Sequence, residues 1–178
     1  MCLYFDQKLT KTYKTSKKSI KAFKVFRVSS FHSVLGEVRY DISSPYKEFN
    51  FIKAGSQYSH MWEDDNKWIP TRKTLSPLEK YSDAIRYGFH FFLKRKDAKN
   101  LSIKRNREYK DSGHYFVVLD FELDPKTVRA AGGFPDPSGV PNICVTKFTM
   151  TQEDRDKAIK SAKRGLSKRR RQQRTLTV

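Results

Sequence analysis

The chain has 178 residues, and its 37 lysines and arginines against 19 aspartates and glutamates give a formal net charge of +18. This length suits one domain with extensions, and an aromatic content of 13% excludes a wholly disordered chain. No apolar run approaches the roughly 18 residues that a membrane span needs. Two cysteines, Cys2 and Cys144, are too few for a disulfide framework or a paired-cysteine metal site, which favours a reducing, cytoplasmic location.

The first half of the chain predicts a sheet protein with a charged beginning. Residues 1–20 are rich in lysine, serine and threonine, so we expect an extended or mobile basic arm. The β-rich segment AFKVFRV over 22–28 predicts the first core strand. Residues 29–42 predict a weaker strand or a hairpin around 33–36, and residues 43–75 predict a loop with short strands.

A helix start, a helix end and a strand follow one another over the middle of the chain. Ser76 can cap a helix that has Pro77 at its first position, and Glu79 completes a capping box. Gly88 then marks the end of that helix. The apolar run after it predicts a strand over 89–93, and a short helix over 95–101 follows.

The strongest strand signal lies over 115–123, where apolar residues alternate along one face. The turn-rich segment 132–141 separates it from a last strand over 142–150. Thr151 and Asp154 then resemble a second capping box, which predicts a helix from about 152 to 166 that runs into a basic tail.

These elements predict an α+β fold: a mainly antiparallel sheet of four to six strands, two or three helices, and basic N- and C-terminal extensions. Strands outnumber helices and do not alternate with them, which disfavours a doubly wound sheet. The expected organisation is a basic arm over 1–20, a single domain over 21–150, and a helix running into the basic tail over 151–178.

Positive charge is concentrated at the two ends. Residues 1–28 hold eight bases and one acid, and residues 157–178 hold nine bases and no acid. A near-neutral body with cationic ends is typical of polyanion binding, because bases that contact phosphates release condensed counterions. The N-terminal lysines recur every three or four residues, so they would form one cationic stripe if that segment were helical; a solvated arm explains them equally well.

Two basic blocks supply the candidate nucleic-acid contacts. The C-terminal run KRGLSKRRRQQR has the pattern of a nucleic-acid arm, and the block over 93–110 follows an aromatic strand directly. A solubilising tail or a localisation signal is the alternative reading; a membrane surface is disfavoured because no apolar helix face accompanies the charge. The candidate residues are Lys94, Arg95, Lys96, Lys104, Arg105, Arg107, Lys163, Arg164, Lys168, Arg169, Arg170, Arg171 and Arg174.

Aromatic side chains beside these bases suggest single-strand binding, in which bases stack on rings. The candidates for stacking are Phe89, Phe91, Phe92 and Phe116, for which a place in the core is the default interpretation.

The sequence offers few catalytic residues. None of His32, His60, His90 and His114 has the spacing of a metal site, and no nucleotide-binding glycine loop is present. If their strands were neighbours, His90 and His114 could act as acid and base in phosphodiester cleavage; a structural role is the default. We expect no cofactor and no metal, and we lean towards a non-enzymatic protein.

Two stretches suggest a resemblance. FKVFRVSSFHSVLGEVRY over 23–40 and YGFHFFLKRKDA over 87–98, followed by the strand at 116–125, resemble small uncharacterised proteins encoded by bacteriophages. The resemblance covers about 23–150 and implies an accessory phage protein in the host cytoplasm, acting on host defence, transcripts or the genome. The basic ends lie outside it.

A second resemblance supplies a rival. Arg27 on a strand, then Gly88–Phe92 and an Asp-Ala helix, loosely resemble ADP-ribosyltransferase folds, whose acid would here have to be Asp120 or Glu122. The sequence lacks the His-Tyr-Glu or Arg-Ser-Glu set of that family, which disfavours transferase activity.

We therefore expect a nucleic-acid-binding protein that grips phosphates with its cationic ends and favours RNA or single strands. A further host or phage protein is a possible partner, and a membrane is not. One alternative is an anti-defence protein that binds a host protein, or a signalling nucleotide in a pocket lined by Arg27, His90 and Lys94. The second alternative is an ADP-ribosyltransferase-like or nuclease enzyme.

Overall fold

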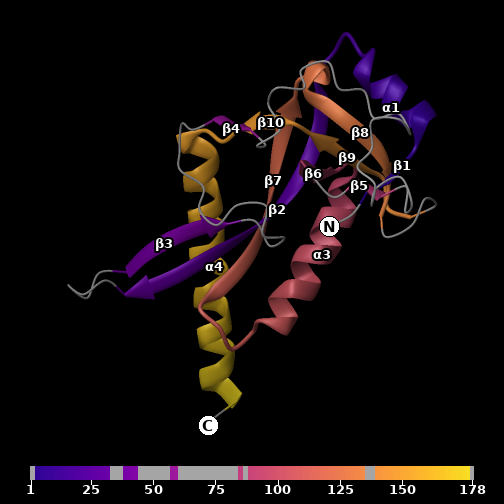
Figure 1. Cartoon of the computed structure of the whole chain (residues 1–178). Helices are drawn as coiled ribbons and strands as arrows, with labels where there is room; N and C mark the ends of the chain where they lie inside the picture. Colours follow the sequence, from indigo (N-terminus) through magenta and orange to yellow (C-terminus); the bar gives the residue numbers. More distant parts are fainter. Residues whose placement is uncertain are drawn as a thin grey trace. The chain divides into compact units, whose positions relative to one another are not determined.

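The computed structural model describes residues 3–32, 38–43, 57–59, 84–85, 88–134 and 139–176, and Figure 1 shows their arrangement along the chain. The chain forms two compact units. Unit 1 contains Met1–Lys24, Gln57–Asp97 and Asp120–Thr149, and unit 2 contains Val25–Ser56, Ala98–Leu119 and Met150–Val178. Each unit draws on three separate segments of the chain.

Unit 1 is built on an antiparallel sheet. From the beginning of β2 (Ile20–His32), the order is β6 (Phe89–Phe92), β9 (Asn142–Val145), β8 (Val128–Gly133), β1 (Leu3–Phe5) and β5 (Ala84–Ile85). A separate pair joins β10 (Lys147–Thr149) to β4 (Gln57–Ser59). The core includes Phe91, Phe121 and Phe148, whose rings meet edge to face at centroid distances of 5.2–5.5 Å.

The beginning of the chain is folded, so the expectation of an extended or mobile arm is wrong. Residues of β1 pair with β8, and Asp6 caps helix α1 (Gln7–Lys14) by accepting a hydrogen bond from the Leu9 amide at 2.8 Å. On the inner face of α1, the Thr10 hydroxyl donates to the Ala131 carbonyl at 3.1 Å and accepts from the Ala131 amide at 2.8 Å. A threonine that is a poor helix former therefore fits here because both of its hydrogen-bonding functions are satisfied.

Unit 2 places helices on both faces of a strand. Its strands are the later part of β2, β3 (Val38–Ser43) and the first part of β7 (His114–Leu123), with β2 paired antiparallel to β3 and also paired to β7. The ring of Tyr115 lies against Gly165 of helix α4 (Gln152–Leu176). The next ring along β7, Phe116, packs against Tyr109, just after helix α3 (Arg95–Glu108). Because consecutive side chains of a strand point to opposite faces, α3 and α4 cover opposite faces of β7.

The predicted fold class is confirmed: the chain is α+β with a mainly antiparallel sheet. Among the described residues the main sheet has eight strands, more than the four to six expected, partly because β1 and β5 were not expected. The helix expected over 77–87 lies outside the described residues except at 84–85, which form β5, so that helix does not reach Gly88.

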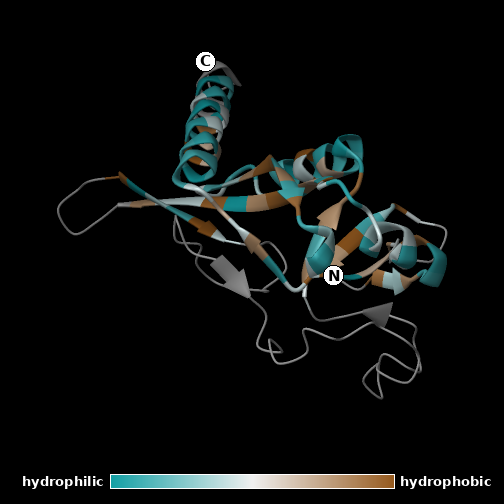
Figure 2. Ribbon diagram, turned by 90° about the horizontal axis from the view of Figure 1, so that it is seen from above, coloured by the Kyte–Doolittle hydropathy of each residue, from teal (hydrophilic) through white to brown (hydrophobic). Residues whose placement is uncertain are grey.

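Several boundaries differ from those expected. Helix α3 continues to Glu108 and helix α4 to Leu176, ten residues beyond the predicted end. The last predicted strand is interrupted at Thr146 into β9 and β10. In the described part of the chain, no helix has both the length and the apolar character needed to cross a membrane, and Figure 2 colours much of α4 as hydrophilic.

Candidate nucleic-acid interface

Helix α4 begins at the capping box that the sequence predicted. The Thr151 hydroxyl accepts from the Asp154 amide at 3.1 Å, and the Asp154 carboxylate accepts from the Thr151 amide at 3.1 Å and the Thr151 hydroxyl at 2.7 Å. This reciprocal arrangement satisfies backbone donors that have no partner inside the helix. The start of α4 is therefore determined locally.

One face of α4 is buried. Ala158, Ala162 and Leu166 lie on that face and are in the core. Arg155, on the same face, donates to the Tyr40 carbonyl of β3 at 3.3 Å. These contacts fix the rotation of the helix about its own axis, and so they decide which side chains face solvent.

The exposed face of α4 carries a basic stripe, which we define as Lys160, Arg164, Lys168 and Arg171. Their side chains are all exposed, and spacings of four, four and three residues place them on one side of an α-helix. From Lys160 to Arg171 the helix rises about 16 Å. No acid occurs from residue 157 onward, so no acidic side chain of α4 lies within the stripe.

Two further lysines flank the basic stripe and are engaged with neighbours. The Lys157 ammonium lies 2.8 Å from the Glu153 carboxylate, and the Lys163 ammonium lies 5.0 Å from the centroid of the Tyr40 ring. Both side chains are exposed, so these contacts are weak ones at a solvated surface.

Arg169 differs from the other candidate bases because it points inward and is half-buried. One guanidinium nitrogen donates to the Tyr109 and His114 carbonyls at 3.1 and 3.0 Å, and the other donates to the Asn106 backbone and side-chain oxygens at 2.8 and 2.7 Å. The guanidinium also lies 4.7 Å from the centroid of the Tyr115 ring. Burial lowers the pKa of Arg169, while Tyr115 and Asp111 act in the opposite direction. Its donors hold α4 to α3 and β7.

Asn106 completes this connection between helices and strand. Its side-chain amide donates to the Phe116 carbonyl at 2.8 Å, and its side-chain oxygen accepts from the Phe116 amide at 2.9 Å. Ser102, one turn earlier, donates to the same carbonyl at 2.7 Å. This role of Asn106 could not be predicted from the sequence, because its partners lie ten residues away on β7 and 63 residues away on α4.

The remaining candidate bases are distributed over both units. Lys94, Arg95 and Lys96 belong to unit 1 and are exposed, with Arg95 3.7 Å from Asp120. In unit 2, Lys104 and Arg107 are exposed on α3.

Three other candidate bases, Arg105, Arg170 and Arg174, are not shown as exposed side chains. Arg105 is half-buried and forms a 2.9 Å ion pair with Glu108. Arg170 and Arg174 lie in α4, but their side chains fall outside the described part of the structure.

The aromatic side chains considered for base stacking are core residues. Phe89, Phe91, Phe92 and Phe116 are all buried, which confirms the default interpretation. Exposed rings occur elsewhere in unit 2, at Phe31 (42% exposed) and Tyr109 (40% exposed).

The histidines do not form a catalytic pair. His90 is 1% exposed, and its strand β6 has β2 along one edge and β9 along the other, so β7 cannot be the neighbour of β6. His114 belongs to the other unit; burial, and then the charge of Arg27, lower its pKa. The side chains of His32 and His60 lie outside the described residues.

The two acids considered for the enzymatic alternatives have partners within unit 1. Asp120 lies 4.0 Å from Lys21, and Glu122 accepts from the Ser19 hydroxyl at 2.7 Å. His90 is too deeply buried to line an open pocket with Arg27 and Lys94, as the signalling-nucleotide hypothesis requires.

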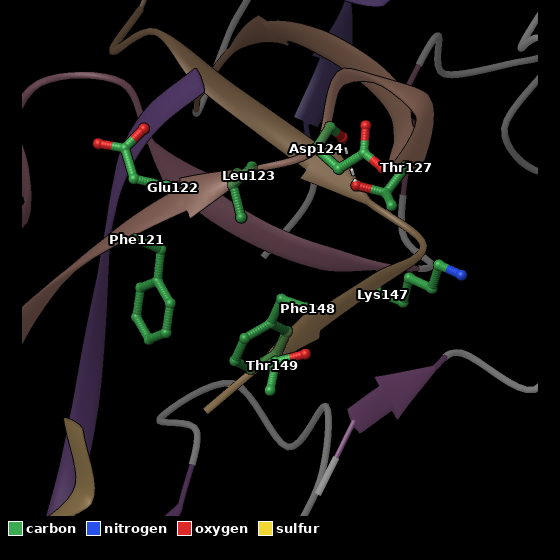
Figure 3. Close-up of a pocket in the computed structure, with 8 residues that line it drawn as sticks. All are labelled: Phe121, Glu122, Leu123, Asp124, Thr127, Lys147, Phe148 and Thr149. Atoms are coloured by element: carbon green, nitrogen blue, oxygen red, sulfur yellow. Dashed lines mark hydrogen bonds between the residues drawn. The ribbon is translucent and has the colours of Figure 1, made fainter. Parts of the chain in front are cut away.

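A cavity of about 280 Å³ lies in unit 1, between the end of β7 and β10 (Figure 3). Phe121, Leu123 and Phe148 are among its lining residues, and Figure 3 shows the Glu122 carboxylate pointing away from these three side chains. Lys147 is the base among the lining residues, so the cavity does not favour a phosphorylated ligand. Within the described residues, no three His, Cys, Asp or Glu side chains gather in a way that could hold a metal ion.

Comparisons with protein-family models, with curated proteins and with solved structures found no match to this chain.

Proposed function

We propose that the protein binds nucleic acid, and that the basic stripe of α4 makes the main phosphate contacts. The observation that carries the proposal is the stripe itself: four exposed bases on one side of a helix whose opposite side is packed in the core. Such an array has a fixed position in unit 2, in contrast to a solvated tail whose charges are averaged over many conformations.

Counterion release explains why such a surface would bind. Each base that neutralises a phosphate releases condensed counterions, and the gain does not depend on base sequence. The chain as a whole carries a formal charge of +18, so its long-range field also attracts a polyanion. Arg169 is left out of the proposed contacts because its donors already bind carbonyl oxygens.

Phosphate contact is common to RNA and DNA, so the preference for RNA stays a prediction. An accessory role in a bacteriophage, in the host cytoplasm and with a further host or phage protein as partner, stays a prediction in the same way. The two enzymatic alternatives and the pocket for a signalling nucleotide gain no support from the geometry of His90, Asp120 and Glu122.

The test is a matched pair of charge-removal variants. Lys160→Ala/Arg164→Ala/Lys168→Ala, the stripe variant, removes three stripe bases at exposed helical positions where alanine favours the helix. Lys8→Ala/Lys11→Ala/Lys18→Ala, the arm variant, removes the same charge from exposed positions of unit 1.

Affinity for a labelled oligonucleotide is measured by fluorescence anisotropy at about 100 mM salt. We expect the stripe variant to lose at least about thirtyfold in affinity and the arm variant less than about threefold. Equal losses in the two variants would mean that net charge matters and the stripe does not. Unmeasurable binding by the unmodified protein would refute nucleic-acid binding itself.

A further inference from the structure

Resting on the proposed function, we infer that the basic stripe is built for the backbone of a double helix in preference to a single strand. This reverses the preference for single strands that the basic and aromatic blocks of the sequence suggested. Three features of unit 2 carry the inference: the rigidity of the array, the chemistry of the exposed face of α4, and the direction of the exposed aromatic rings.

The helix face opposite to the stripe is packed into unit 2, which restricts movement of the stripe. Ala158, Ala162, Leu166 and Arg169 anchor the opposite face of α4, so the backbone positions of the stripe bases are set before a ligand arrives. A duplex presents phosphates at set intervals because it is stiff over about 150 base pairs. A flexible single strand would have to be ordered along the same array, at a cost in conformational entropy.

The exposed face of α4 lacks what single-strand binding uses. Between Lys160 and Arg171, the exposed non-basic residues are Ser161 and Ser167, which are small and polar. No aromatic residue occurs from Gln152 to Leu176. Single-strand binders gain about 1–3 kcal/mol for each base that stacks on an aromatic ring. Without that gain, phosphate contacts alone decide the preference.

Among the described residues of unit 2, the exposed aromatic rings Phe31 and Tyr109 lie on faces other than the one that α4 covers. Tyr109 packs against Phe116, on the face of β7 opposite to α4. On β3, Tyr40 is the residue that lies under Lys163 of α4, so its neighbour Arg39 points to the other face of the ribbon. Phe31 is paired with Arg39 and shares that face. Phe31 and Tyr109 therefore do not share the face of α4 that carries the stripe, and they offer no stacking surface along it.

Charge density favours the same partner. A double helix carries one charge per about 1.7 Å of its axis when both strands are counted, so a length of duplex equal to the stripe carries about nine phosphates in all. Counterion release per contact is also larger for duplex DNA than for single strands, with slopes of about −0.9 and −0.7 per phosphate.

The test compares four probes of about 20 nucleotides or base pairs at about 50 mM salt: duplex DNA, duplex RNA, oligothymidylate and an unstructured RNA strand. We expect at least one duplex to bind about tenfold or more tightly than either single strand, and the stripe variant to lose that preference. The arm variant should keep it. The DNA and RNA duplexes separate the two sources of the same phosphate chemistry.

The possible failures are distinguishable. Single strands that bind as tightly as both duplexes, with the stripe variant impaired on all probes, would overturn the duplex preference and leave nucleic-acid binding intact. A preference for duplex that survives in the stripe variant would also overturn it, since the preference would then come from another surface. No binding to any probe would remove the proposed function itself.

Discussion

The ring of Tyr115 fills the space that a side chain at Gly165 would need. A Cβ added to Gly165 would overlap the outer atoms of the Tyr115 ring, and the guanidinium of Arg169 covers the same ring from one turn further along α4. A glycine in the middle of a helix costs stability, so its presence here is explained by the approach of α4 to β7.

We therefore expect Gly165→Ala to destabilise the fold by about 1–3 kcal/mol, because overpacking outweighs the better helix propensity of alanine. Urea unfolding followed by circular dichroism measures the effect. The exposed control Ser167→Ala should change stability by less than about 0.5 kcal/mol. A stabilised Gly165→Ala variant would show that the helix does not approach Tyr115 so closely.

Arg169→Lys should reduce stability and leave nucleic-acid affinity almost unchanged. Lysine keeps the charge but cannot reproduce a planar fork that reaches four oxygen atoms, so we expect a loss of about 1–3 kcal/mol in unfolding free energy. Affinity at constant salt should change by less than about twofold. The reverse result, normal stability with weakened binding, would make Arg169 a phosphate contact after all.

The fold should become less stable as the pH falls below about 6.5, in part through His114. Its folded pKa is lowered, so the unfolded chain binds the proton more readily. The stabilising contribution is complete above the unfolded value and is lost as the pH falls towards the folded one. The change in unfolding free energy between about pH 7.5 and about pH 5.5 should be smaller in His114→Gln than in the unmodified protein. An identical pH dependence in both proteins would assign it to other groups.

Thr151→Ala should weaken the start of α4. It removes a cap whose hydroxyl accepts from the Asp154 amide, and such losses cost about 0.5–2 kcal/mol. Thr151→Ser keeps the hydroxyl and should recover most of the stability. If serine is as destabilising as alanine, the methyl group of Thr151 matters more than its hydrogen bonds.

Features that depend on neighbouring residues could be predicted from the sequence, and features that depend on distant partners could not. The alternation along β7 and the capping box at Thr151 are local patterns, and both are present in the structure. Helix α1 could not be foreseen, because the partner of Thr10 lies 121 residues away. The hairpin between β2 and β3 lies near the expected place, although residues 33–37 are outside the described part of the chain.

The same distinction between local patterns and distant partners applies to the candidate interface. The spacing of Lys160, Arg164 and Lys168 is visible in the sequence, and so are the two alanines that mark the opposite face of α4. The inward position of Arg169 is not visible, because the oxygen atoms that hold it belong to α3 and β7. A run of consecutive arginines indicates charge, and only the packing of the helix decides which of them remain exposed.

The salt dependence of duplex affinity tests the central claim most directly. Between about 50 and 200 mM salt, the slope of log affinity against log salt should be less steep in the stripe variant than in the unmodified protein by about 2.7 units, which corresponds to three lost phosphate contacts. The arm variant should retain the original slope to within about half a unit. A stripe variant with an unchanged slope would contradict the account, because the bases at 160, 164 and 168 would then contact no phosphate.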